Sequence, residues 1–327
     1  MIPTLQSADW SLSALPHIDS NTAMGAAARA IDPGFHTVHP GAYDGQFYWG
    51  IAIDPLATGA LHRAFDKPSY RYGHPLYGWL GWLGSAGQAR AVPASLAAIS
   101  LASLFAAAAA AVLLGLARGR SGWEGLFVAL NPGLISSAVN DLAEPLAAAL
   151  LLGTFLALVR GKRVASWLCL MLLPLAKEPL VVVPLAVIAW NLVRHRRRPA
   201  LAYATAVIPA LAWWTYARIQ LGAWFTSGDT ALGRPFVAWY RALVHQGVAS
   251  DIAVVGLLIL FAVAAVRASR VRGPVELSYL ALAAIALCLA PNATLAFTTA
   301  MRNTAFLLVL VPFVIVSPAL FPRQRIS

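Results

Sequence analysis

The sequence from Pro93 to Ala117 reads PASLAAISLASLFAAAAAAVLLGLA and contains no charged side chain. A helix that crosses the hydrocarbon core of a bilayer needs about 20 consecutive apolar residues, and this run is long enough. The whole chain has the same character, with 59% hydrophobic and 11% charged residues and a mean hydropathy of +0.69. Soluble domains carry about 25% charged residues. The sequence therefore predicts an integral membrane protein.

Further apolar runs extend this prediction to most of the chain. They lie at about 123–140, 143–159, 164–176, 179–193, 200–220, 251–266, 275–292 and 303–320. The runs at 200–220 and 303–320 also reach spanning length. The predicted fold class is all-α, a polytopic bundle of transmembrane helices.

Two of these regions are irregular. The run at 123–140 is interrupted by Asn131-Pro132-Gly133, which predicts a kinked or re-entrant element, because proline breaks the hydrogen bonds of a helix. The runs at 164–176 and 179–193 are short, and together they predict a hairpin. Its tip, Lys177-Glu178-Pro179, is expected within the membrane region or at its surface.

Charge predicts the orientation of the spans. If the chain alternates sides through these runs, one side receives a strong excess of basic residues, with Glu124 and Glu276 as its acids. By the positive-inside rule this side is cytoplasmic, so residues 1–92, residues 221–250 and the opposite ends of the helices face outward. The basic residues on the cytoplasmic side are Arg118, Arg120, Arg160, Lys162, Arg163, Arg194, Arg196, Arg197, Arg198, Arg267, Arg270, Arg272, Arg323 and Arg325.

The first 92 residues differ from the rest of the chain. They contain no apolar run of spanning length and no signal-peptide pattern. We therefore divide the chain into an extracytoplasmic loop region, 1–92, and a multi-span transmembrane domain, 93–327, with a cytoplasmic C-terminus. An additional first helix upstream of Met1 is expected, and export driven by the helix at 93–117 is the alternative.

Two short helices are predicted in the loop region. Gln46 to Ile53 is apolar enough for a short helix. Tyr77 to Leu83 contains Trp79 and Trp82, and tryptophans at this density indicate an interfacial helix lying on the membrane.

In a soluble protein, a net charge of +11 would favour a nucleic-acid partner. Here the charges form short clusters between apolar runs, so no nucleic-acid partner is expected. Cys169 and Cys288 lie inside apolar runs and are expected to pack as small apolar residues. The sequence contains no Gly-rich phosphate loop and no nucleophile turn of the Ser/His/Asp type.

A candidate carbohydrate site precedes the spans. The segment from His39 to Trp49 reads HPGAYDGQFYW and places Asp44 among Tyr43, Gln46 and Tyr48. Aromatic rings pack on sugar faces, and a carboxylate can accept a proton from a hydroxyl or hold it. The alternative is an ordinary polar loop. Asp54, shortly after, is a further candidate for sugar hydroxyls or a metal.

Other acids near the spans are candidates because charge in a membrane is costly. Asp141 and Glu144 stand at the outer start of the run at 143–159, where they could bind sugar hydroxyls or a metal. The alternative is helix capping, with Asp141 as N-cap and Glu144 at the third helical position.

Five basic or acidic groups are candidates for a phosphate site. Lys177 would bind the phosphate with Glu178 orienting it, or the two would form a local ion pair that closes the turn. Arg302 precedes the last run, where it either binds phosphate or anchors the helix end by snorkelling. Arg71 and His74 could bind phosphate or transfer a proton.

The histidines of the sequence give no clear metal-binding pattern. The seven histidines lie mainly before residue 75, at His17, His36, His39, His62 and His74. Their spacings match no metal-binding signature. The sequence therefore assigns no metal ligands and no certain cofactor, and a divalent cation stays an alternative.

Several segments resemble a known family. Tyr43 to Pro55 resembles the first outer loop of bacterial GT-C-type membrane glycosyltransferases, and it is similar to the Trp-Asp-x-x-Trp-Tyr-x-x-Ile-Ala pattern of the GPI-mannosyltransferase type. Arg71 to Leu76 resembles the Arg-x-x-x-Pro-Leu step of that family. Asn131-Pro132-Gly133 with Glu144-Pro145-Leu146, and Leu175 to Glu178, follow in the expected order.

The resemblance implies an activity. It makes Asp44 the catalytic acid/base or acceptor-orienting residue and makes Arg71, Lys177 and Arg302 the cations that hold a phosphate. The donor would be a polyprenyl-phosphate sugar, the acceptor a glycan, lipid or protein, and the location a bacterial inner membrane. The chain departs from the family pattern in lacking its first helix.

The expected function is therefore an integral membrane glycosyltransferase, of the hexosyl-transferring GT-C type, that acts at the extracytoplasmic face. The alternative is a transporter or flippase of lipid-linked sugars without enzymatic activity. It would need polar groups along both leaflets, and the runs at 93–117 and 303–320 contain few. A structural subunit of a cell-envelope complex is a third reading.

Overall fold

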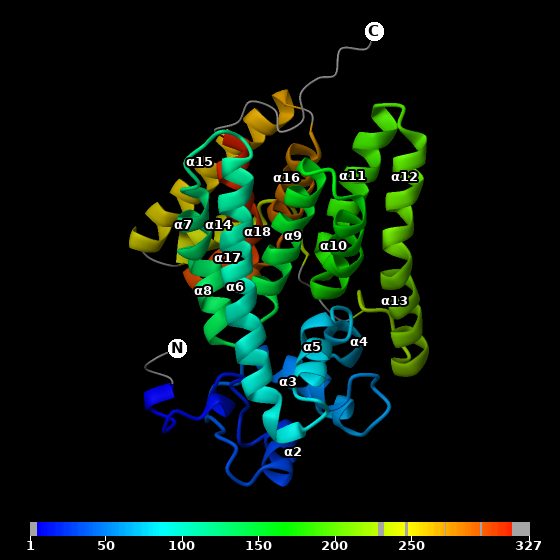
Figure 1. Cartoon of the computed structure of the whole chain (residues 1–327). Coiled ribbons are helices and arrows are strands. Elements are labelled where there is room, and N and C mark those ends of the chain that lie inside the picture. Colours follow the sequence, from blue (N-terminus) through cyan, green and yellow to red (C-terminus); the bar gives the residue numbers. More distant parts are fainter. Residues whose placement is uncertain (1–4, 228–231, 246–247, 272, 295, 316–327) are drawn as a thin grey trace.

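The computed structural model describes residues 5–227, 232–245, 248–271, 273–294 and 296–315. Within these ranges it is 72% helical and has no strands, which confirms the predicted fold class. A long bundle of helices stands on a smaller region formed by the first 90 or so residues, in which the helices are short (Figure 1).

The helices follow the chain in this order. The first region contains η1 (Leu12–Ala14), α2 (Ala23–Ile31), α3 (Gly45–Ile53), η2 (Leu61–Ala64), α4 (Pro68–Arg71), α5 (Leu76–Gly84) and η3 (Ala89–Ala91). The bundle contains α6 (Val92–Leu116), α7 (Glu124–Ala129), α8 (Pro132–Val139), α9 (Glu144–Val159), α10 (Arg163–Ala176), η4 (Glu178–Val181), α11 (Val182–Val193), α12 (Arg197–Ala204), η5 (Thr205–Val207), α13 (Ile208–Leu221), α14 (Val237–His245), α15 (Val248–Arg270), α16 (Pro274–Leu287), η6 (Pro291–Ala293), α17 (Phe297–Asn303) and α18 (Ala305–Ile315).

Among the described residues, two helices are long and apolar enough to cross a membrane, Ala89–Leu116 and Ser250–Arg270. The first confirms the run at 93–117. The second extends the run at 251–266 into polar residues at both ends and so reaches spanning length. A third span is possible if α17 and α18 form one element, although they meet at an angle of 61°.

Two runs that were expected to reach spanning length are interrupted or only partly described. The run at 200–220 is helical, but it passes from α12 through the 3-10 turn η5 into α13. It also begins beside Arg197 and Arg198, so the apolar part is shorter than the helix. The run at 303–320 begins at the bend between α17 and α18, and residues 316–320 lie outside the described residues.

The predicted break at Asn131-Pro132-Gly133 is confirmed. Asn131 caps α8, because its Oδ1 accepts from the backbone N–H groups of Gly133 at 2.9 Å and Leu134 at 3.2 Å. Pro132 stands at the first helical position, where its missing N–H costs nothing. The Asn131 amide also donates to the carbonyl of Ala305 at 3.3 Å, so the break is tied to the start of α18.

The predicted hairpin is confirmed as α10, η4 and α11. Its tip, Lys177, has extended backbone angles, φ −153° and ψ 118°. Figure 1 shows the tip at the end of the bundle that meets α4 and α5. The hairpin therefore brings Lys177 and Glu178 to the region formed by the first residues of the chain.

The two short helices predicted in residues 1–92 are also present, as α3 and α5. The side chains of Trp49 and Tyr77 are fully buried, while Trp82 and Leu83 at the end of α5 are 42% and 62% exposed. The Tyr77 hydroxyl donates to the carbonyl of Leu96 at 2.8 Å, which fixes α5 against α6.

Helix α13 holds the turn between α4 and α5 through two adjacent tryptophans. The Trp213 indole N–H donates to the carbonyl of Tyr72 at 2.6 Å, and that of Trp214 donates to Gly73 at 2.8 Å. Both indoles are buried. Two successive peptide groups are thus positioned by a helix that lies far along the chain.

The start of α3 requires a glycine. A Cβ atom on Gly45 would collide with the carbonyl oxygen of Asn140 and would lie 3.1 Å from the Cα of Pro16. Backbone atoms cannot yield as a flexible side chain does, so Gly45→Ala is expected to lower the free energy of unfolding by about 1–3 kcal/mol. Thermal unfolding of the purified protein in detergent measures this. Gly34→Ala, whose Cβ would meet nothing closer than 3.5 Å, is the control, and equal losses in both variants would contradict the prediction.

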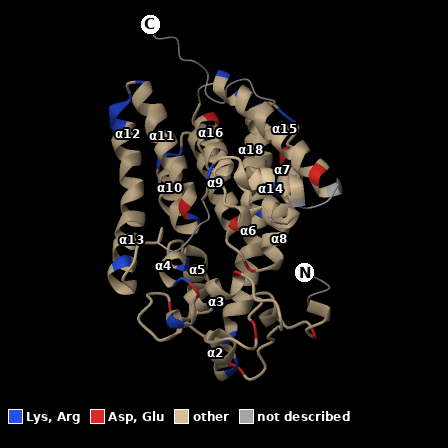
Figure 2. Ribbon diagram, turned by 180° about the vertical axis from the view of Figure 1, so that it is seen from behind, with Lys and Arg blue, Asp and Glu red and all other residues tan. Residues whose placement is uncertain are grey.

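Basic residues gather at the end of the bundle far from α2–α5. Figure 2 shows Lys and Arg at the outer ends of α12 and α15, with the region around α3 and α4 carrying both signs of charge. This arrangement is the one that the sequence predicts if the end carrying α12 faces the cytoplasm. The orientation itself stays a prediction.

Candidate active site

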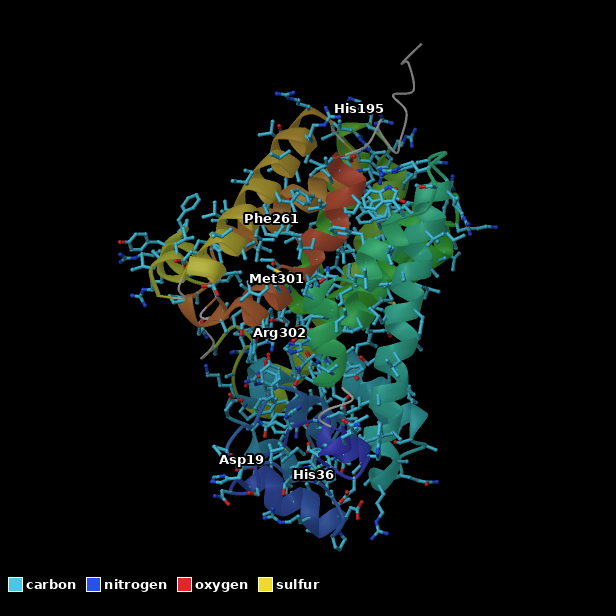
Figure 3. The ribbon with its side chains drawn as sticks, turned by 90° about the vertical axis from the view of Figure 1, so that its left-hand side faces the viewer. Asp19, His36, His195, Phe261, Met301 and Arg302 are labelled. Carbon is cyan, nitrogen blue, oxygen red and sulfur yellow. The ribbon has the colours of Figure 1, made fainter. Side chains whose placement is uncertain are left out.

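Asp44 connects three distant parts of the chain. It immediately precedes α3 but does not cap that helix with its side chain. Its Oδ1 accepts a hydrogen bond from Arg71, at the end of α4, at 3.0 Å, and its Oδ2 accepts one from Arg302, on α17, at 2.6 Å. Figure 3 shows Arg302 where the bundle meets the first region of the chain. The predicted loop aspartate is therefore held by two guanidinium groups.

The charge state of Asp44 follows from these contacts. Burial of the carboxylate by itself raises its pKa, but the charges of Arg302 and Arg71 and the hydrogen bond from Arg302 outweigh this effect. Together they hold the pKa of Asp44 well below its usual range. Asp44 is therefore ionised at neutral pH and is a weak base in this arrangement.

The lowered pKa of Asp44 predicts how stability depends on pH. A carboxyl group with a lower pKa in the folded state stabilises the protein above its unfolded pKa, about 3.9, and this stabilisation is lost as the pH falls through the folded pKa. The difference in thermal unfolding between wild type and Asp44→Asn is therefore expected to stay constant from pH 7 to about pH 5. It should shrink only below about pH 4. A difference that already disappears between pH 7 and pH 5 would show that Asp44 is not held by both arginines.

Arg71 is fixed on more than one side. Its Nε and one terminal nitrogen donate to the two carboxylate oxygens of Asp66 at 3.0 and 2.9 Å. Its guanidinium carbon lies 3.8 Å from the centre of the Phe47 ring. Asp66 and Phe47 were not singled out from the sequence. Phe47 could have been found, because it lies three residues after Asp44 and so shares a face of α3 with it.

Arg302 is held in a similar way by residues from two other elements. Its second terminal nitrogen donates to the Tyr43 hydroxyl at 3.0 Å. Its Nε lies 3.4 Å from Oε1 of Glu144. Only 12% of its side chain is exposed. Arg302 is thus directed into the protein, and the alternative in which it snorkels at a helix end is wrong.

Lys177 and Glu178 form separate ion pairs, which corrects the predicted local pair and the predicted orienting role of Glu178. The Lys177 ammonium lies 3.0 Å from Oε1 of Glu144, and Oε2 of Glu178 lies 2.7 Å from Nδ1 of His74. Neither a local Lys177–Glu178 pair nor orientation of Lys177 by Glu178 is observed. The reason is the extended backbone at Lys177, which directs successive side chains in opposite directions.

The capping alternative for Asp141 and Glu144 is also wrong. Helix α9 begins at Glu144 itself, with Ala143 as the N-cap and no side-chain cap. Glu144 instead joins Lys177 to Arg302. Asp141 is fully buried with φ +49°, and it does not line the pocket around Asp44.

Asp54 and Gln46 are not brought to Asp44 either. Asp54 closes the turn after α3, where its Oδ1 accepts from the N–H groups of Thr58 and Gly59 at 2.9 and 3.0 Å. Its Oδ2 lies 3.2 Å from Nδ1 of His62. Gln46 is buried on α3 and does not line the pocket around Asp44.

The remaining residues enclose a small polar pocket, which we call the Asp44 pocket. Its cavity volume is about 10 Å³, about the room that one water molecule needs. It is lined by Asp44, Phe47, Tyr48, Ile51, Tyr70, Arg71, His74, Lys177 and Arg302. Tyr48 and Tyr70 pack against the His74 ring, with centroids 5.7 and 5.5 Å apart. Ile51 and Tyr70 were missed by sequence analysis, because burial rather than charge brings them here.

Cations and carboxylates meet at the Asp44 pocket. Three cations, Arg71, Lys177 and Arg302, face it, and each already has carboxylate partners at its edge. Guanidinium groups suit phosphate because they donate in a planar fork. Among the described residues, no group of three or more His, Cys, Asp or Glu side chains is placed to hold a metal ion.

No protein-family model matches this sequence, and no curated protein matches it. Among solved structures, the crystal structure of ArnT from Cupriavidus metallidurans in the apo state is similar in fold. The TM-score is 0.50 at 15% sequence identity, and the alignment covers 97% of this chain and 59% of that chain. This chain thus spans 59% of the length of the ArnT chain. At this identity the likeness shows the fold alone, a GT-C-like polytopic bundle of an integral membrane protein.

Proposed function

We propose that this chain is an integral membrane glycosyltransferase that transfers a sugar from a polyprenyl-phosphate donor to an acceptor at the extracytoplasmic face. The observation that supports it most is one carboxylate held among three cations, Asp44 with Arg71, Lys177 and Arg302, in a pocket at one end of a membrane bundle. ArnT, whose fold is similar, is a GT-C glycosyltransferase.

The three cations bind the phosphate of the donor. They come from both proposed parts of the chain, Arg71 from residues 1–92 and Lys177 and Arg302 from residues 93–327. Asp66, Tyr43 and Glu144 hold them in place before the donor binds. Fixed cations stabilise negative charge on the leaving phosphate as the bond to the sugar breaks, without reorganising at that moment.

Asp44 accepts the proton of the acceptor hydroxyl after the donor has bound. In the described state both of its oxygens accept from arginine, so it is too weak a base. A donor phosphate competes for the same N–H groups, and as it takes them the carboxylate becomes more basic. The hydroxyl oxygen then attacks the anomeric carbon, its proton passes to Asp44, and the polyprenyl phosphate leaves with the electrons of the broken bond.

The aromatic side chains of the pocket contact the sugar. Tyr48 and Tyr70 both pack against the His74 ring and line the same pocket as the three cations. Ring faces of this kind pack against the C–H groups of a sugar. His74, with Glu178 on its Nδ1, presents its other ring nitrogen as a hydrogen-bonding group.

Transfer of radiolabelled sugar from a panel of polyprenyl-phosphate donors, in membranes that contain the protein, tests this proposal. The panel includes a mannosyl donor, because the similarity to the GPI-mannosyltransferase pattern implies mannose. The likeness to ArnT does not support mannose as the donor sugar. Label in a glycan, lipid or protein product above the level of membranes without the protein is expected. Binding of the lipid carrier without transfer from any donor would favour a transporter of lipid-linked sugars.

A further inference from the structure

A second cavity lies between α10 and α12, at the end of α10 opposite Lys177. Its volume is about 430 Å³, and it is open to the protein surface. Figure 1 shows α11 between the two helices in this view, with the upper end of α12 far from α3 and α4. The 14 residues of α10 separate this cavity from the Asp44 pocket by about 21 Å at 1.5 Å per residue. The proposed transfer reaction makes no use of it.

Two arginines and two aromatic rings form its walls. Arg163 is the first residue of α10, Arg198 lies in the first turn of α12, and Trp167 and Tyr203 lie between them. The Trp167 indole donates to the Thr205 hydroxyl at 2.9 Å, and the hydroxyls of Ser166 and Tyr203 are 2.9 Å apart. These contacts bind α10 to α12 and η5 without using either guanidinium group.

The cavity is electropositive, and the described residues supply no counter-ion to it. Among the described residues, neither Arg163 nor Arg198 has an ion pair or side-chain hydrogen bond to an acid. The links 160–163 and 194–198, which border the cavity, carry only basic charges. Both helices begin here without a side-chain cap, so their N-terminal dipoles add to the positive field.

Exposed apolar side chains also adjoin the two arginines. Val164, Leu168 and Leu201 are 73%, 42% and 69% exposed on the adjoining helix faces. Val164 and Ala202 also line the cavity. An inorganic anion would neutralise the arginines but would leave these side chains uncovered. A ligand that carries both a phosphate and an acyl chain satisfies both requirements.

We propose that this cavity binds one anionic phospholipid of the surrounding membrane. Its phosphate accepts hydrogen bonds from Arg163 and Arg198, and an acyl chain lies along Val164, Leu168 and Leu201. The lipid thus fills the gap between α10 and α12. It holds the end of the hairpin that lies opposite the tip with Lys177. This proposal does not depend on the proposed transfer activity.

Native mass spectrometry of the full chain, titrated with phosphatidylglycerol or phosphatidylcholine in detergent, tests the proposal. One phosphatidylglycerol should bind more tightly than phosphatidylcholine. The double variant Arg163→Gln/Arg198→Gln should weaken its binding at least about tenfold, since hydrogen bonds to charged groups are lost. The control, Arg160→Gln/Arg197→Gln, removes the same charge from the same end but outside the cavity, and should bind as wild type does.

Several results would overturn the proposal. Equal losses in both double variants would mean diffuse attraction to basic residues rather than a site. Competition by soluble glycerol phosphate at similar concentrations would mean an anion site that needs no acyl chain. A second measurement does not depend on the arginine variants folding. Brominated phosphatidylglycerol should quench the fluorescence of Trp167, which is identified as the part of the emission lost in Trp167→Phe. If this part is not quenched, the lipid lies elsewhere.

Discussion

Asp44→Asn is expected to lower the rate of sugar transfer by about 10²–10⁴-fold, the range that a general base contributes. The amide cannot take a proton, and it leaves Arg71 and Arg302 without the negative charge that both contact. Because those arginines remain free to hold phosphate, binding of the lipid donor should be retained or strengthened. Initial rates at saturating donor, with donor binding measured separately, resolve the two effects.

Asp66→Asn is the matched control for this variant. Asp66 contacts the same Arg71 through two hydrogen bonds, yet it does not line the Asp44 pocket and its side chain is 47% exposed. Its loss should loosen Arg71 and raise the KM for the donor with a much smaller effect on kcat. If Asp44→Asn keeps full activity, or if the two variants are equally impaired, Asp44 is not the base.

Lys177→Met is expected to lower the free energy of unfolding by about 3–5 kcal/mol, as is typical when one partner of a buried ion pair is removed. The side chain of Glu144 is only 2% exposed, and that of Lys177 16%. Without Lys177, Glu144 keeps only the longer contact with Arg302 at 3.4 Å. Chemical denaturation or thermal unfolding in detergent measures the loss.

The double variant Lys177→Met/Glu144→Met separates charge pairing from packing. It leaves no carboxylate buried without its lysine, so it should recover part of the stability lost in Lys177→Met. Transfer should stay low, because a phosphate-binding cation is still absent. If the stability losses of Lys177→Met and Glu144→Met add up to the loss of the double variant, Lys177 and Glu144 do not interact.

The sequence predicted those parts of the fold that depend on local patterns. The apolar run at 93–117 is α6, Asn131-Pro132 breaks the next run as its capping chemistry requires, and α3 and α5 are where short apolar segments were expected. The bend of 61° between α17 and α18 was not predicted. No proline or glycine stands at Thr304, so no local signal marks it. Helix α14 was also missed, because its composition is mixed.

The site was predicted by residue type better than by pairing. Asp44 was singled out by its aromatic and amide neighbours, and Arg71, Lys177 and Arg302 as candidate phosphate ligands. The structure places all four in one pocket. Their partners were not predictable, because the tertiary fold alone determines whether Lys177 pairs with Glu144 or with Glu178. Asp54 and Asp141 carry the same kind of signal in the sequence, but the structure places them outside the pocket.

The indole N–H groups of Trp213 and Trp214 fix the position of α13 along its axis relative to the candidate site. Neighbouring residues of a helix point about 100° apart, and here each finds a different carbonyl, those of Tyr72 and Gly73. If α13 were shifted by one residue along its axis, both bonds would be lost together. Arg71 and His74 flank those two carbonyls, so an error in the position of α13 would displace the proposed phosphate-binding arginine.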